Sequence, residues 1–178
     1  MDLQHLQIDL FQPWINMSSL GNFNSTEEMG KFDFTMRATS NDLKTVNSYG
    51  DMSFISTDQE LPYDNEKKEL SSVEIFLAGI LESMMLTIIR EAKIKKLSLD
   101  EIEVKAEVRT TNPLRTLKVV GVEEAPRIEE INIKVYYYID DIKEEDADKF
   151  MNNAIDMDMI YIGVKKGFNI QVEFIYQL

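Results

Sequence analysis

The longest apolar run in the chain, within residues 71–99, predicts a long buried helix. Apolar residues fill nearly every position from 73 to 89, so this helix has no polar face and must be covered on most sides. Ser71 and Glu74 have the spacing of a capping box, in which each side chain accepts from the other residue's backbone N–H. The clean run is shorter than the roughly 20 residues that a bilayer requires, and Glu82 interrupts it. We therefore predict the central helix of a globular protein.

Alternating apolar and polar positions predict strands on both sides of this helix. Before it, the pattern occurs at 31–39, and a short returning strand is expected at 52–56. After it, strands are expected at 101–110, 127–140 and 168–178. The predicted inward-facing residues of the strand at 127–140 are Ile131, Ile133, Val135 and Tyr137.

A second, shorter helix is expected at 143–157, with acidic residues in its first turn. Five apolar residues are spaced to form one face of this helix: Ala147, Phe150, Met151, Ala154 and Ile155. The order of elements predicts an α+β fold, with residues 1–29 as an N-terminal arm and 30–178 as a single domain. The long helix has no partner of its own length in the chain, and a symmetric homodimer would cover it.

The composition of the chain argues against several classes of partner and of catalytic chemistry. The 178 residues carry a formal net charge of −13, which argues against nucleic acid or an anionic membrane as a partner. The absence of cysteine removes disulfides, thiol catalysis and iron–sulfur clusters. With His5 as the single histidine, neither a multi-histidine metal site nor a Ser-His-Asp triad is expected. The start lacks the pattern of a signal peptide, so we expect a cytoplasmic protein. We also expect no metal and no cofactor.

The sequence VEIFLAGILESMMLTIIREAKIKKLSLDEIEVKAEV, residues 73–108, resembles the core signature of the OsmC/Ohr family. In that family, a stretch rich in Leu and Ala on the central helix leads to a reactive cysteine, a threonine four residues later, and a strand rich in Glu and Val. The residues that fall in register are Glu74, Leu77, Ala78, Thr87 and Ala92. In this alignment Ser83 occupies the place of the reactive cysteine.

The family's second cysteine belongs to a Cys-Pro-Val motif that follows the second helix. With Ala154 and Gly167 as anchors, the resemblance places Asp158 at that cysteine and Met159 at the proline. Ser83 and Asp158 are therefore expected to face each other, within hydrogen-bond reach.

The resemblance covers roughly residues 31–178 and implies an OsmC-like fold: a long central helix and a second helix packed with antiparallel sheets, in an intertwined homodimer. In the family, thiol-dependent reduction of organic hydroperoxides, a stress response, occurs in two interface pockets, with an arginine and a glutamate assisting. Arg37 is the candidate for that arginine. Because a serine hydroxyl cannot form or resolve a sulfenic acid, we expect no thiol peroxidase activity in this chain.

Several interpretations of the pocket remain open. The first is a dimer that binds an apolar small molecule; its expected lining is Phe76, Glu82, Ser83, Met84, Thr87, Asp158 and Met159. The second is a non-thiol enzyme that uses Glu82, Ser83 and Asp158, with Arg37 as a further candidate. In a variant of it, Glu82, Asp156 and Asp158 would hold Mg²⁺ or Ca²⁺. The others are a residual hydroperoxide-related stress protein and a purely structural dimer.

Overall fold

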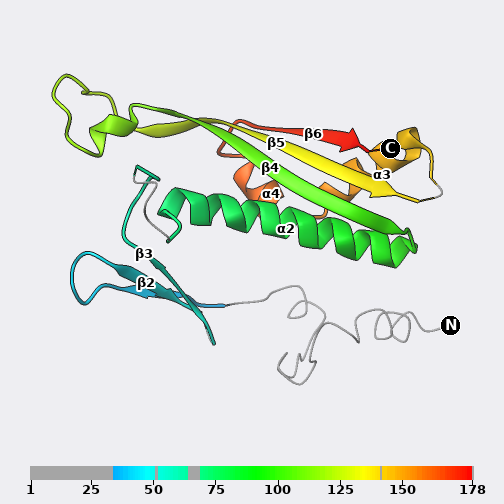
Figure 1. Ribbon diagram of the computed structural model, residues 1–178, viewed down its shortest axis with the longest axis horizontal. Helices are drawn as coiled ribbons and strands as arrows, with labels where there is room; N and C mark the ends of the chain where they lie inside the picture. Colours follow the sequence, from blue (N-terminus) through cyan, green and yellow to red (C-terminus); the bar gives the residue numbers. More distant parts are fainter. Residues whose placement is uncertain (1–33, 51, 64–68, 141, 178) are drawn as a thin grey trace. The chain divides into compact units, whose positions relative to one another are not determined.

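The computed structural model describes residues 34–50, 52–63, 69–140 and 142–177, and Figure 1 shows its helices and strands. The chain forms two compact units, Met1–Asp58 and Gln59–Leu178. The predicted N-terminal arm, its boundary with the domain, and His5 lie outside the described residues.

The first unit contains a small antiparallel sheet in the order β1-β2-β3. Its strands are β1 (Arg37–Thr39), β2 (Val46–Tyr49) and β3 (Phe54–Thr57). The prediction of two strands is wrong here, because β2 lies between them; a turn closed by the Gly50 N–H and the Ser53 carbonyl joins β2 to β3. Alternation at 31–39 places Phe34 and Met36 on one face of the predicted strand, but both are exposed, because they precede β1 and only three residues of the predicted strand pair.

The second unit is built on a larger sheet in the order β4-β5-β6. Its strands are β4 (Leu99–Thr111), β5 (Arg127–Ile139) and β6 (Ile170–Tyr176), which confirms the three predicted strands. β4 runs antiparallel to β5, with Val104 opposite Val135, whereas β6 runs parallel to β5, with Phe174 opposite Val135. The parallel pair differs from the expected antiparallel sheets, because two helices carry the chain back to the starting end of β5.

Three α-helices lie along one face of this sheet (Figure 1). They are α2 (Ser72–Lys95), α3 (Glu144–Ile155) and α4 (Met159–Val164), and a short 3₁₀ turn, η3 (Pro113–Arg115), interrupts the β4–β5 connection. All five apolar residues predicted for the buried face of α3 are buried, as are the four predicted for β5. The sequence analysis did not predict α4.

α2 begins as predicted, and its buried residues lie on one side of the helix. Its capping box is present: the Ser71 backbone N–H and hydroxyl donate to Glu74 Oε2 at 2.8 and 2.6 Å. Its buried residues are Ile80, Met84, Thr87, Ile88 and Ala92. The spacing of these five places them on one side of the helix, whereas Leu86 is 67 % exposed. Within the described part of the second unit, the sheet and the two shorter helices contact one side of α2.

Among the described residues, α2 is the one helix that is long and apolar enough to cross a membrane by length and composition. The core helix of a soluble protein meets the same test. The buried side of α2 belongs to the same apolar cluster as β5, α3 and Tyr161.

Replacing Ser71 by alanine is expected to lower the free energy of unfolding by about 1 kcal/mol at neutral pH, because the helix loses its N-cap acceptor. Hydrogen bonds from Ser71 hold the pKa of Glu74 below its usual value. A lowered native pKa gives stability that is present above the unfolded-state pKa and is lost as the pH falls through the native pKa. Urea unfolding should therefore show a smaller difference between variant and parent in acid than at neutral pH; an equal difference would contradict this account.

Replacing Thr111 by valine is expected to raise the free energy of unfolding by about 1 kcal/mol, because valine has the same shape and removes a buried polar atom that has no partner. The Thr111 hydroxyl oxygen is buried without a hydrogen bond. Thr116→Val is the matched control and should be destabilising, because the Thr116 hydroxyl donates to the Pro113 carbonyl at 2.8 Å. Thermal or urea unfolding of both variants measures the difference, and a destabilised Thr111→Val would contradict the prediction.

Candidate functional site

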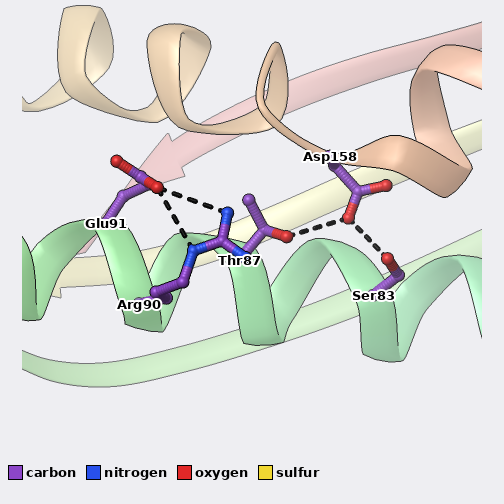
Figure 2. Close-up of polar contacts among 5 residues, drawn as sticks. All are labelled: Ser83, Thr87, Arg90, Glu91 and Asp158. Carbon is purple, nitrogen blue, oxygen red and sulfur yellow. Dashed lines mark hydrogen bonds and ion pairs between the residues drawn. The ribbon is translucent and has the colours of Figure 1, made fainter. Parts of the chain in front are cut away.

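The centre of the candidate site is a group of three side chains that joins α2 to the start of α4, here called the Ser83–Thr87–Asp158 cluster. Ser83 and Thr87 are one helical turn apart and so lie on the same side of α2. Figure 2 shows both side chains pointing from α2 toward Asp158. The Ser83 hydroxyl donates to Asp158 Oδ2 at 2.6 Å, and the Thr87 hydroxyl donates to the same oxygen at 3.1 Å. The expected contact between Ser83 and Asp158 is present.

Local sequence fixes the position of Asp158. α3 ends at Ile155, and Asp158 is the N-cap of α4. Its Oδ1 atom accepts from the Tyr161 backbone N–H, one of the helix donors that otherwise lacks a partner. The side chain is fully buried. Both carboxylate oxygens therefore have donors from this chain, which compensates for the loss of water around a buried charge.

This arrangement limits the chemistry available to Ser83. A serine hydroxyl attacks a substrate only when a base removes its proton. Here the Ser83 hydroxyl points at a carboxylate that already accepts two further hydrogen bonds, and carboxylates are ordinarily weak bases for a hydroxyl. The cluster is a satisfied structural connection between two helices and lacks the features of an activated nucleophile.

The other predicted pocket residues lie in different environments. Met84 is fully buried in the core, and Phe76 is partly buried, with its ring 5.4 Å from that of Phe168. Glu82 is exposed on α2, and Met159 is 76 % exposed. Within one chain, the structure thus brings together three of the seven predicted lining residues.

Two predicted charged groups have surface contacts. Arg37 lies on β1 in the first unit, and its guanidinium is 5.3 Å from the centre of the Tyr49 ring. Asp156 is exposed, and its carboxylate is 3.6 Å from the Lys165 ammonium. In the described part of the chain, no three acidic or histidine side chains are grouped as metal ligands, so the geometry does not support a cation held by Glu82, Asp156 and Asp158.

Sequence analysis missed two features of the site. α4 is one, and an available signal was Asp158 followed directly by the mostly apolar stretch that forms the helix. The ion pair of Arg90 and Glu91, one turn beyond Thr87, is the other (Figure 2). The two atoms of this pair are 3.3 Å apart, and the Glu91 side chain is mostly buried. Adjacent residues seldom face each other on a helix, so the sequence gave little reason to expect this contact.

The fold corresponds to the OsmC-like class of α+β proteins. The family model described as OsmC-like protein matches residues 65–173, more than half of the chain. The chain belongs to the OsmC-like family, as a divergent member without cysteine. No curated protein matches the chain.

Solved structures share the fold at low sequence identity. An OsmC-like protein from Mycoplasma pneumoniae has a TM-score of 0.62 and 15% identity, covering 81% of this chain and 98% of its own. An organic hydroperoxide resistance protein OsmC from Legionella pneumophila has a TM-score of 0.55 and 13% identity, covering 81% and 97%. The organic hydroperoxide resistance protein OhrB of Bacillus subtilis has a TM-score of 0.54 and 12% identity, covering 80% of this chain and 98% of its own.

Proposed function

We propose that this protein is a non-redox member of its family that acts as a homodimer and binds an apolar small molecule at the subunit interface. The observation that carries the proposal is the buried carboxylate of Asp158, bonded to Ser83 and Thr87. Ser83 and Asp158 occupy the two positions at which the family resemblance implies reactive thiols. A hydrogen-bonded serine and aspartate keep the two helices joined but supply neither thiolate nor resolving thiol.

The uncovered side of α2 supports the dimer. Leu86 is largely exposed there, and the partly exposed apolar residues Ile75, Met85 and Ile89 lie on the same side, where the exposed Glu82, one turn before Leu86, is the one acidic residue among them. An apolar stripe of this length is costly to leave in water. A second copy of the chain presents the same stripe, so a two-fold axis would bury both at once.

The junction of α3 and α4 supports an apolar ligand. Three large apolar residues next to the buried Asp158 are exposed: Met157 in the short connection, and Met159 and Ile160 in the first turn of α4. Exposed apolar groups gathered in one place are typical of binding surfaces, and thioether side chains adapt to ligands of varied shape. In the proposed dimer, Ser83 and Met159 lie at the edge of the pocket, and Met84 supports it from the core.

Native mass spectrometry of freshly purified protein tests this proposal, because it reports the number of subunits and any retained molecule together. A dimer that carries a defined extra mass is the expected result. A monomer at micromolar concentration would contradict the proposed assembly, and a bare dimer would favour the structural alternative. An assay of metal-free and haem-free protein with an organic hydroperoxide and a dithiol should show no turnover; measurable turnover would contradict the non-redox role.

A further inference from the structure

A cavity lies at the start of α2, apart from the Ser83–Thr87–Asp158 cluster. Its volume is about 820 Å³, within the range of small-molecule sites in proteins. At 1.5 Å per residue, Val73 at its edge is about 15 Å along the helix axis from Ser83. The walls come from the segment before α2, the first turn of α2, the β4–β5 connection with the adjoining strand ends, and the turn before β6, and they include Leu61, Val73 and Phe168.

Hydrogen bonds hold two of these walls together. The Tyr63 hydroxyl donates to the Pro113 carbonyl at 2.7 Å and lies 2.8 Å from the Thr116 hydroxyl, which ties the segment before α2 to the β4–β5 connection. At the other end of that segment, the Glu60 carbonyl accepts from the Val73 N–H at 3.2 Å. The cavity is therefore formed without a ligand, and this N–H group in the first turn of α2 is already used within the chain.

Two charged side chains line the cavity, Glu60 and Arg127. In the described part of the chain, neither forms an ion pair with another residue. The rest of the lining is apolar or carries hydroxyl groups. In a chain of net charge −13, the cavity thus offers one cation, one anion and an apolar surface. A complementary ligand has one carboxylate, one ammonium group and apolar side chains.

We propose that this cavity binds small apolar zwitterions, namely short apolar peptides or apolar amino acids. The ligand carboxylate pairs with the Arg127 guanidinium, and its ammonium group pairs with the Glu60 carboxylate. Its apolar side chains lie against Leu61, Val73 and Phe168. This site is separate from the proposed interface pocket, so either proposal can fail without the other.

NMR titration of the full chain with trileucine at low ionic strength tests the proposal. We expect saturable shifts of the amide signals around the cavity. N-acetylated trileucine lacks the ammonium group and trileucine amide lacks the carboxylate, and each should bind about threefold more weakly, the effect typical of an exposed ion pair. Free leucine separates the two sources: tighter binding of trileucine indicates a peptide site, and equal binding indicates an amino acid site.

Two variants assign the charged contacts. In Glu60→Gln, N-acetylated trileucine should bind as tightly as trileucine, while trileucine amide should still bind more weakly. In Arg127→Gln, trileucine amide should bind as tightly as trileucine, while the N-acetylated peptide should still bind more weakly. Arg115→Gln is the matched control, because Arg115 lies in the β4–β5 connection between the lining residues Pro113 and Thr116 but donates to the Val122 carbonyl at 2.9 Å and does not line the cavity. Absence of saturable binding up to about 10 mM trileucine, a free energy near −3 kcal/mol, would overturn the proposal. Weaker binding of both modified peptides in both variants would also overturn it.

Discussion

Replacing Asp158 by alanine is expected to lower the free energy of unfolding by about 3 kcal/mol. The variant leaves the Ser83 and Thr87 hydroxyls and the Tyr161 N–H without their acceptor. Each lost hydrogen bond to a buried charged group costs about 1.5–3 kcal/mol, and loss of an N-cap costs about 1 kcal/mol. The three effects share one side chain, so the total is smaller than their sum. Urea unfolding at fixed protein concentration, followed by circular dichroism, measures the change.

Asp156→Ala is the control for this experiment. Asp156 lies two residues earlier and forms an exposed ion pair with Lys165, so its loss should change stability by less than about 1 kcal/mol. Asp158→Asn should fall between the two, because the amide oxygen still accepts from the Tyr161 N–H while its NH₂ group faces two hydroxyls. Equal effects of Asp158→Ala and Asp156→Ala would show that the buried cluster does not join the helices as described.

Replacing Leu86 by glutamate is expected to convert the proposed dimer to a monomer. Leu86 is 67 % exposed in the single chain, so the change leaves the core of the protomer intact. In a two-fold interface it places two carboxylates in an apolar contact, and burying an unpaired charge costs several kcal/mol. A rise of the dimer dissociation constant by at least about a hundredfold follows from a loss of roughly 3 kcal/mol. Sedimentation equilibrium measures it.

Val120→Glu controls for the added charge. Val120 is more exposed than Leu86 but lies in the β4–β5 connection and not on α2. This variant should keep the association state of the parent. If Leu86→Glu also sediments like the parent, the uncovered side of α2 is not the interface. If both variants dissociate, added negative charge alone would account for the result.

Most of the elements of the second unit could be predicted from local sequence. The capping box at Ser71 fixed the start of α2 within one residue, and period-2 alternation predicted β4, β5 and β6. The five apolar residues of α3 were all assigned to the correct face. These signals are local, because helix and strand periods repeat within a few residues and reflect one buried side.

The first unit was predicted less well. Its strands are three or four residues long, which is too short for alternation to separate a strand from a turn. The sequence analysis therefore did not predict the strand at 46–49, which is the central strand of this sheet. The turn closed by Gly50 and Ser53 lies immediately after that strand.

The sequence by itself determined α2, α3 and the strands of the second unit and, through the family resemblance, the positions of Ser83 and Asp158. Only the tertiary structure decided that the Asp158 carboxylate is buried, shared with Thr87 and bonded to the Tyr161 N–H. It also decided which side of α2 packs against the described part of the second unit and that β6 runs parallel to β5. Both outcomes depend on contacts between residues far apart in the chain. Hydrophobic periodicity does not encode such contacts, because it records that a side chain is buried but not which partner covers it.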